Sequence, residues 1–257
     1  MRKPRLAALL ASGSAAASPV LRAIAAAQAI GPVASTSFRV ASRIANTMRA
    51  GRAVPSVDAF EACHVVLISA PDRAVDAAVA QLTAAPFEWK HRTVILIGDD
   101  GERLAPLHEL GAVTGVIAAM PGFEERFFVL EGERAALREL RPLLGRSVRV
   151  LLVPPGARAR FDAAITLAGH ALFPTLVAAD AAFASTGLSR RLTDAVLEKT
   201  VQRAVRAWIN GRRKGWGTLD GQGGARLDPQ IAALEHADPR AGAYFRSLVE
   251  TMREFMR

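Results

Sequence analysis

Residues 6–19 read LAALLASGSAAASP, and this stretch decides the fold. Residues 6–10 form a short apolar run without charge, which predicts a buried β-strand. The small residues that follow predict a tight turn around Gly13. Ser18 and Pro19 then predict the start of a helix, with serine as the N-cap and proline at the first helical position. The chain therefore opens with a buried strand, a glycine-containing turn and a helix.

The same alternation continues to about residue 153. Apolar runs that predict further strands occupy residues 32–35, 64–69, 93–97, 114–118, 127–130 and 148–153. Helical patterns occupy residues 19–30, 38–50, 72–82 and 133–144. The runs are apolar without alternation, which is typical of a sheet covered on both faces. We therefore expect an α/β fold with a mostly parallel, Rossmann-like sheet and right-handed crossovers.

No strand pattern follows Pro155, and the rest of the chain predicts an all-α C-terminal domain. We expect a Rossmann-like domain over residues 1–155 and a helical domain over residues 156–257. Residues 157–186 predict a long helix that Pro174 kinks or breaks. This helix is apolar nearly all round, so we expect it to be buried, with a partner subunit of a homodimer covering it. Helical patterns at residues 188–210, 228–235 and 239–256 follow, the last two after a glycine-rich loop.

Composition favours a cytoplasmic protein. The chain has 257 residues and a single cysteine, Cys63, which cannot form an internal disulfide and suits a reducing compartment. The N-terminus carries Arg2, Lys3 and Arg5 before its apolar run, but that run is shorter than the core of a secretory signal. No window holds the roughly 18 to 20 uninterrupted apolar residues of a membrane span, so we expect no membrane partner.

The formal net charge of +9 would suit an anionic partner. The cationic residues are spread along the sequence, and the only dense run is Arg212-Arg213-Lys214, with Trp208 and Trp216 nearby. No nucleic-acid recognition motif accompanies this charge. A nucleic acid is therefore an unlikely partner on sequence grounds, and nucleic-acid association through that run is the third-ranked function.

The turn after the first strand occupies the place of a dinucleotide phosphate loop. In the pattern G-x-G-x-x-G, the glycines permit the turn, the approach of the pyrophosphate and the packing of helix on strand. Here the register reads Ala11-Ser12-Gly13-Ser14-Ala15-Ala16, so only the middle glycine is present. Alanine at the first place is a defect, because a Cβ disfavours a positive φ, and the phosphate loop is therefore eroded. Ser12, Gly13, Ser14 and Ala15 are candidate phosphate-binding residues, and an ordinary small-residue turn is an equal alternative.

The second strand ends in Ser35-Thr36-Ser37, followed by Arg39 and Arg43. A protein that binds NAD usually has an acidic residue here for the ribose hydroxyls, and none is present. Hydroxyls followed by arginine suit the 2′-phosphate of NADP, so weak NADP binding through Ser35, Thr36, Ser37 and Arg39 is one interpretation. A helix N-cap followed by solvent-facing arginines explains the same residues.

The order of segments resembles an uncharacterised bacterial family that joins a Rossmann-like NAD(P)-binding domain to a helical domain of unknown function. That family is related to pyrroline-5-carboxylate reductase and to the hydroxyacid dehydrogenases. The resemblance covers nearly the whole chain and rests on the following segments: residues 34–37, 65–72, 104–107, 128–132 and 158–172. It implies that Ala70 and Pro71, in the strand-to-helix turn, face a nicotinamide.

The chain also departs from that family where polar groups are expected. Residues 119–123 read AMPGF in place of a turn that contains histidine. Phe161-Asp162 stands where the family has a Tyr-His pair, and His170 stands where an asparagine is expected. Asp162 and His170 lie eight residues apart, so on one helix they would share a face and form a candidate acid–base set. About 12 Å of helix rise separates them, and His170 is more readily explained as a core histidine.

The remaining motifs exclude several other chemistries. Cys63 and His64 are neighbours at a strand entrance and point to opposite faces, which argues against a Cys–His dyad. No His-x-x-x-His or Cys-x-x-Cys spacing predicts a metal site. The leading hypothesis is an NAD(P)-dependent oxidoreductase-like protein acting on an unknown small metabolite. The alternative is a non-catalytic Rossmann-like protein that binds a small anion or a partner protein, so whether the chain is an enzyme stays open.

Overall fold

The computed structural model describes residues 6–13, 17–212 and 227–256. The chain divides into two compact units, Met1–Phe161 and Asp162–Arg257. The boundary expected from the sequence, between residues 155 and 156, falls just before the helix that runs across this division. Ser14, Ala15, Ala16, Arg213, Lys214 and the rest of the glycine-rich loop lie outside the described residues.

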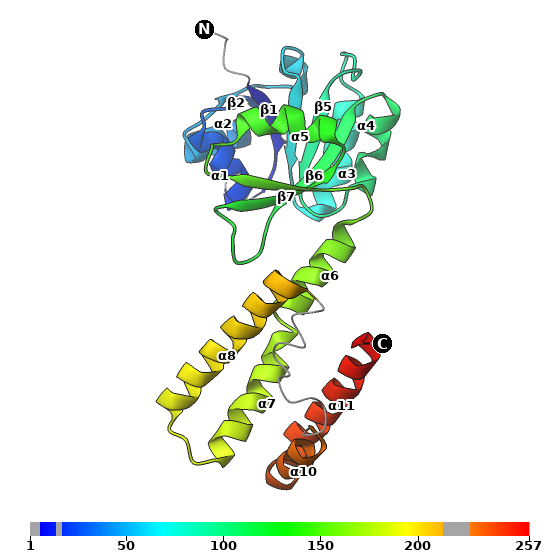
Figure 1. The fold of residues 1–257 in the computed structure, drawn as a ribbon. Coiled ribbons are helices and arrows are strands. Elements are labelled where there is room, and N and C mark those ends of the chain that lie inside the picture. Colours follow the sequence, from blue (N-terminus) through cyan, green and yellow to red (C-terminus); the bar gives the residue numbers. More distant parts are fainter. Residues whose placement is uncertain (1–5, 14–16, 213–226, 257) are drawn as a thin grey trace. The chain divides into compact units, whose positions relative to one another are not determined.

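The first unit is built on one eight-stranded sheet (Figure 1). Its strands are β1 (Ala7–Ala11), β2 (Ile30–Ala34), β3 (Arg52–Ala53), β4 (Val65–Ser69), β5 (Thr93–Ile97), β6 (Val113–Ala119), β7 (Phe127–Gly132) and β8 (Arg149–Val153). They lie in the order β3-β2-β1-β4-β5-β6-β7-β8. The six strands from β3 to β6 are parallel, and β7 pairs antiparallel with β6. The expected Rossmann-like, mostly parallel sheet is therefore confirmed.

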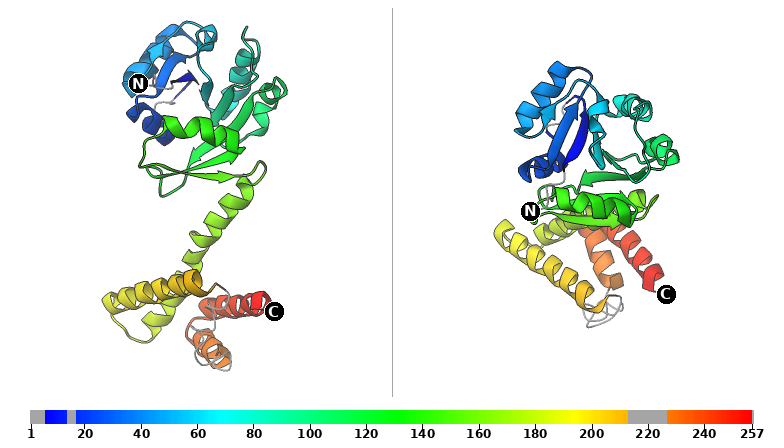
Figure 2. Two further views of the ribbon diagram at one scale, coloured as in Figure 1. Left: turned by 45° about the horizontal axis from the view of Figure 1, so that its top comes forward. Right: turned by 90° about the horizontal axis from the view of Figure 1, so that it is seen from above.

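Helices cover both faces of this sheet (Figure 2). The bounds are α1 (Pro19–Ala26), α2 (Phe38–Met48), η2 (Val57–Phe60), α3 (Asp72–Thr83), η3 (Glu102–Leu104), α4 (Ala105–Glu109), α5 (Arg134–Leu140) and η4 (Arg141–Leu143). One core layer joins α1, α2 and α5 to the sheet, and the other joins η2, α3 and α4 to it. Both layers consist mainly of apolar side chains with almost no exposed area, which accounts for the uninterrupted apolar character of the central strands.

The sequence did not predict the direction of β7. Only residues 120–126 join β6 to β7, and so short a connection allows a hairpin but no helical crossover. β8 pairs parallel with β7 and ends the sheet as an edge strand. The two-residue strand β3 at the other edge also went unpredicted, because its sequence, Arg52-Ala53, has no apolar run.

The second unit is helical, as expected. Its helices are α7 (Leu172–Ser185), α8 (Arg190–Gly211), α10 (Leu227–Ala237) and α11 (Pro239–Met256), and α6 (Arg158–Ala168) leads into it. The helix expected over residues 157–186 is interrupted by turn residues 169–171. Pro174 is not the break itself, because it lies in the first turn of α7, where a proline needs no intrahelical partner.

The expectation that this apolar segment is buried is wrong for the single chain. Residues Arg158–Ser185 form a helical stretch of 28 residues with a mean hydropathy of 1.4, and none of its most apolar window is buried. By length and composition the stretch is sufficient to cross a membrane, which was not expected from the sequence. On sequence grounds, an uninterrupted apolar run was required for a membrane span. Thr166, Gly169 and His170 interrupt this stretch, so it did not meet that requirement.

Candidate functional site

A crevice lies at the carboxyl ends of the central strands of the first unit. The chain runs from β1 to β2 and β3 on one side of β1, then returns to place β4, β5 and β6 on its other side. This reversal between β1 and β4 is the topological switch point, where open α/β sheets bind their ligands. A cavity of about 370 Å³ is found there, lined by residues from the ends of β1, β4, β5 and β6 and from the start of α1.

The turn between β1 and α1 depends on Gly13. Its backbone φ is +63°, in the left-handed region that disfavours side chains. A Cβ at this position would also lie 3.0 Å from Cγ of Pro71, in the turn after β4. Gly13 therefore lets two neighbouring strand ends approach each other closely, and the crevice opens beside them.

The defect predicted at Ala11 is not present. Ala11 is the last residue of β1, is fully buried, and is not among the residues with positive φ. An extended backbone tolerates a Cβ, so alanine is compatible with this first position of the loop. Of the two alanine substitutions weighed in the sequence, Ala11 is thus harmless, and Ala16 lies outside the described residues.

Two serine hydroxyls line the crevice next to this turn. The Ser12 amide donates a hydrogen bond to the Ser69 carbonyl, which ties the ends of β1 and β4 together. The Ser12 hydroxyl is buried and has no hydrogen-bond partner in the structure. Ser18 is the N-cap of α1, yet its side chain makes no capping hydrogen bond. Among the described residues, the crevice therefore holds a buried hydroxyl without a hydrogen-bond partner, on Ser12, and an N-cap hydroxyl that does not cap its helix, on Ser18.

Of the candidate residues after β2, two make hydrogen bonds within the protein and two are exposed. Ser35 is buried, and its hydroxyl donates to the Ala11 carbonyl at 2.5 Å, so it fastens β2 to β1. This hydrogen bond gives Ser35 a structural role, and its role as a nucleotide contact stays a prediction. Ser37 is the N-cap of α2 and accepts a hydrogen bond from the Val40 amide. Thr36 and Arg39 are exposed at the same end of the helix.

Two further strand ends complete the crevice. Ser69, Ala70 and Pro71 line it from the end of β4, and that Ala70 and Pro71 face a nicotinamide stays a prediction. Gly98 and Asp99 line it from the end of β5. Sequence reasoning missed Asp99 at this site. The signal was available, because Asp99 follows a buried parallel strand just as Ala70 does, and carboxyl ends of parallel strands meet at one edge.

Asp99 also reaches the helix that leaves the sheet. The Arg158 guanidinium lies 3.4 Å from an Asp99 carboxylate oxygen, and Arg158 is buried at the first position of α6. Asp162 is half-buried one turn further along α6, on the face that Arg158 occupies. A buried guanidinium thus links the crevice to the start of the helix that carries Asp162.

His170 does not lie as predicted. It falls in the turn between α6 and α7, so it does not share a helix face with Asp162. It is also exposed in the chain, which argues against a core histidine. The two residues were proposed as an acid–base set because they would share one helix face, and the structure does not place them so. A catalytic role for either residue stays a prediction.

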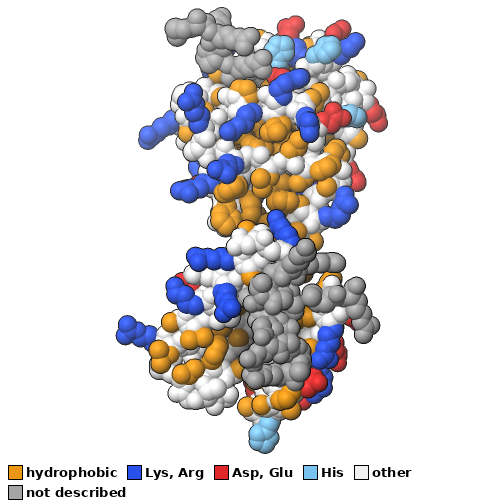
Figure 3. All heavy atoms as spheres, in the orientation of Figure 1, with side chains coloured by type: hydrophobic (Ala, Val, Ile, Leu, Met, Phe, Trp, Pro, Cys, Tyr) orange, Lys and Arg blue, Asp and Glu red, His pale blue; other side chains and the backbone are white. Residues whose placement is uncertain are grey.

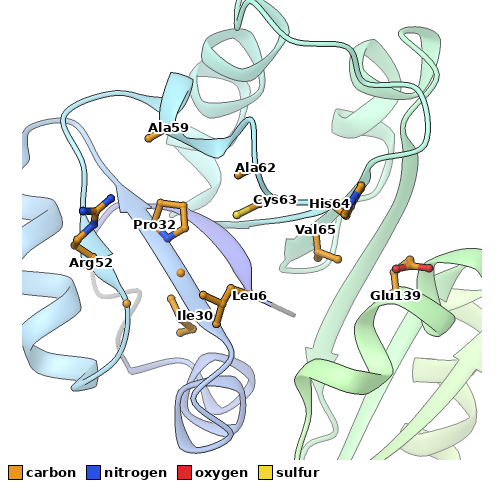
Figure 4. A pocket seen from close by; sticks show the side chains of 12 residues that line it. Leu6, Ile30, Pro32, Arg52, Ala59, Ala62, Cys63, His64, Val65 and Glu139 are labelled. Atoms are coloured by element: carbon orange, nitrogen blue, oxygen red, sulfur yellow. The ribbon is translucent and has the colours of Figure 1, made fainter. Parts of the chain in front are cut away.

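A larger cavity, of about 730 Å³, lies at the opposite edge of the sheet (Figure 4). It is lined mainly by Leu6, Ile30, Pro32 and Val65 at the amino ends of β1, β2 and β4. Its charged side chains, Arg52 and Glu139, lie at opposite ends and do not converge on one point. Because polar groups that fix a ligand's orientation converge in binding sites, we assign the candidate site to the smaller crevice.

Cys63 and His64 both line this second cavity but do not form a reactive pair. Cys63 is buried while His64 is exposed, and both residues precede β4. Burial raises the pKa of the Cys63 thiol, so the thiol stays protonated at neutral pH and is a poor nucleophile. Within the described ranges, no group of three or more His, Cys, Asp or Glu side chains could hold a metal ion.

Fold and site together define a Rossmann-like sheet with a ligand crevice at its switch point, followed by a helical unit. No family model matches the sequence, and no curated protein matches it. Solved structures match the fold along nearly the whole chain. A variant of imine reductase from Myxococcus stipitatus in complex with NAD⁺ has 16% identity and a TM-score of 0.64, covering 97% of this chain and 94% of that chain.

Two further structures show the same likeness. A reductive aminase from Aspergillus terreus in complex with NADPH has 18% identity and a TM-score of 0.58, covering 98% of this chain and 95% of that chain. A protein from Bacteroides fragilis, described only provisionally as an NADP oxidoreductase, has 13% identity and a TM-score of 0.68, covering 98% of both chains. Identities this low show that the fold is shared.

Proposed function

We propose that this protein is an NADP-dependent oxidoreductase that acts on a small metabolite. The observation that carries the proposal is the crevice at the switch point between β1 and β4, beside the Gly13 turn and the start of α1. This is the place where folds of this class hold a dinucleotide. The structural neighbours in complex with NAD⁺ and NADPH support the same assignment.

The residues of the crevice fit the phosphates of such a ligand. The buried Ser12 hydroxyl has no hydrogen-bond partner in the part of the chain that the structure describes, and a phosphate oxygen would give it one. The Ser18 hydroxyl stands free of its capping role at the N-terminus of α1, where the helix dipole favours negative charge. Gly13 leaves space for the backbone to approach the pyrophosphate.

The end of β2 favours NADP over NAD. No aspartate or glutamate occurs in the first 57 residues, so the carboxylate that receives the ribose hydroxyls of NAD is missing. Thr36, Ser37 and Arg39 instead offer two hydroxyls and a guanidinium at the N-terminus of α2. Guanidinium groups pair well with phosphate, and a 2′-phosphate is the group that distinguishes NADP.

When bound, the nicotinamide would supply or accept a hydride. Protein groups would then have to position the substrate and move a proton. We propose Asp162 for the proton, because it stands at the place where the resembled family carries a polar pair at the start of the long helix. Asp162→Asn should then lower turnover while leaving NADPH affinity unchanged.

The test of this function starts with a titration of the whole protein with NADPH and NADH, read by nucleotide fluorescence. Turnover is then assayed as NADPH oxidation with small imines and ketones, and as NADP⁺ reduction with 2-hydroxy acids. The proposal expects saturable binding with tighter NADPH, and turnover of at least one class. Binding without turnover of any class would favour the non-catalytic alternative. An absence of binding of either nucleotide would refute the proposal.

We also propose that the helical unit pairs with a second copy. Among its described residues only Thr193, Ile231, Ala241, Gly242 and Val249 are buried. Ten large apolar side chains of this part of the chain are exposed instead: Leu167, Phe173, Val177, Leu188, Leu192, Val196, Val205, Trp208, Ile209 and Phe255. So small a core cannot order a unit of this size unaided, and the exposed apolar area needs a cover.

A second copy covers this surface better than a lipid bilayer does. α7 packs against α8 and α11, so all three would enter a membrane together. α8 carries seven charged side chains: Arg190, Arg191, Asp194, Glu198, Lys199, Arg203 and Arg206. Each charge at the bilayer centre costs about 2.5 kcal/mol or more. The mixture of apolar and charged surface instead suits a protein interface.

A further inference from the structure

The first unit separates its charges between the two helical layers of the sheet. Residues 17–50 and 133–147, which supply α1, α2 and α5, contain eight arginines: Arg22, Arg39, Arg43, Arg49, Arg134, Arg138, Arg141 and Arg146. Only two carboxylates, Glu133 and Glu139, occur in these segments. All eight arginines are exposed. We call this layer the arginine face.

The opposite layer has the reverse balance. Residues 54–112, which supply η2, α3 and α4, contain nine aspartates and glutamates against four lysines and arginines. Two of those four cations are engaged locally, because Arg92 donates to backbone carbonyls and Arg103 pairs with Asp100. The two helical layers therefore carry opposite charge balances, which the net charge of the chain alone does not explain.

Folding brings the arginines together from two distant parts of the sequence. α1 and α2 come from the first 50 residues and α5 from about 90 residues later, yet the three helices share one core layer. Figure 3 shows the result as Lys and Arg side chains spread over the face that carries α5, with the acidic side chains gathered towards its rim. The arginines looked dispersed in the sequence only because the crossover connections separate them.

We propose that the arginine face binds the phosphate backbone of a nucleic acid without sequence preference. Eight exposed guanidinium groups on one surface suit a regularly spaced polyanion. Arg39 and Arg43 lie at the dinucleotide end of this face, but Arg134, Arg138 and Arg146 come from α5 and the loop after it. The face is therefore larger than the cofactor site needs, and the inference does not rest on the proposed function.

The surroundings of the arginines favour a nucleic acid over a membrane or an acidic protein. Within the described part of the first unit, the exposed large apolar side chains are Leu6, Phe38, Leu110 and Phe123. Only Phe38 belongs to α1, α2 or α5. Membrane-binding surfaces and protein interfaces both use aromatic or aliphatic anchors among their charges. Contacts to a phosphate backbone need no such anchors.

The test measures the whole protein against a labelled duplex DNA of about 20 base pairs, by anisotropy, between about 50 and 200 mM salt. The inference expects binding that weakens steeply with salt. A triple variant, Arg134→Gln with Arg138→Gln and Arg146→Gln, should weaken binding about 10-fold or more and lower the slope of log K against log salt by about 3. NADPH affinity should not change in this variant.

A matched control removes the same charge elsewhere. Arg73→Gln with Lys90→Gln and Arg126→Gln replaces three exposed cations outside the arginine face. This variant should bind the duplex nearly as the unmodified protein does. An equal loss in both variants would overturn the inference, because net charge alone would then explain the binding. Tighter binding to phosphatidylserine vesicles or to polyglutamate than to DNA would overturn it as well, as would no binding to DNA at about 50 mM salt.

Discussion

At the scale of single residues, Gly13 is the position on which the proposed site most depends. Its φ of +63° and the 3.0 Å approach of Pro71 act together, one through the backbone and one through packing. Gly122 offers a comparison, because its φ is +78° but a Cβ there would meet nothing within 4 Å. Alanine substitutions at the two glycines therefore distinguish the cost of backbone strain from the cost of the contact with Pro71.

We predict that Gly13→Ala destabilises the protein more than Gly122→Ala does. Gly122→Ala should cost about 1 to 2 kcal/mol, the strain of a left-handed alanine. Gly13→Ala should cost that amount and about 1 kcal/mol more for the contact with Pro71, and should weaken NADPH binding. Urea unfolding measures both variants. Equal losses of stability would show that Pro71 can move away freely.

Arg39 determines the preference for NADP in this account. Arg39→Ala should weaken NADPH binding about 10-fold and leave NADH binding unchanged, since an exposed charge-assisted contact is worth about 1.5 kcal/mol. Ala11→Gly should not tighten either nucleotide, because Ala11 is already extended within β1. Titration of both nucleotides against the three proteins measures this, and an equal loss of NADPH and NADH affinity in Arg39→Ala would contradict it.

At the scale of elements, the pairing of α10 with α11 depends on one close approach. A Cβ at Gly242 in α11 would lie 2.5 Å from Cα and 2.6 Å from N of Glu235 in α10, where no atom can be accommodated. Arg246 then pairs with Glu235 through two hydrogen bonds of 2.9 and 2.7 Å, and this contact lowers the pKa of the Glu235 carboxyl. The glycine permits the helix contact, and the exposed ion pair adds little to it.

We predict that Gly242→Ala lowers the free energy of unfolding by about 2 kcal/mol or more, because backbone must shift to admit the methyl group. Gly211→Ala, at the end of α8, is the matched control, since a Cβ there meets nothing within 4 Å. It should be neutral or slightly stabilising. Thermal unfolding measures both. A neutral Gly242→Ala would mean that α10 and α11 are packed less closely than described.

The elements were predictable from the sequence where burial alone determines them. The strands at residues 65–69 and 93–97 are apolar at every or nearly every position because both faces are covered, so the pattern was clear. The direction of β7 depends on the length of its connection to β6, and the break at residues 169–171 depends on the neighbours of α7. The hydrophobic periodicity of the sequence carries no information on either. Gly13 was predicted because it follows the first strand, and Ala70 and Pro71 were implied by the family resemblance. The hydrogen bond that Ser35 donates to residue 11 across the sheet could not be predicted from the sequence.

At the scale of the whole molecule, the exposed apolar side chains of α7 predict a dimer. Val177 is 67% exposed in the single chain. Val177→Glu should raise the dimer dissociation constant about 100-fold or more, because an unpaired buried carboxylate costs at least about 3 kcal/mol. Light scattering over a concentration series measures this, with Leu110→Glu in the first unit as a control that leaves the dimer intact. A monomeric unmodified protein at micromolar concentration would contradict the proposal.

The central claim is that a dinucleotide binds at the carboxyl edge of the sheet and not in the larger cavity at the amino edge. Amide hydrogen exchange with and without NADPH tests this most directly, because it reports where the ligand protects the backbone. The account predicts slower exchange in peptides that cover the β1–α1 turn and residues 69–73, with unchanged exchange in residues 59–64. Protection confined to residues 59–64, or no protection anywhere at saturating NADPH, would contradict it.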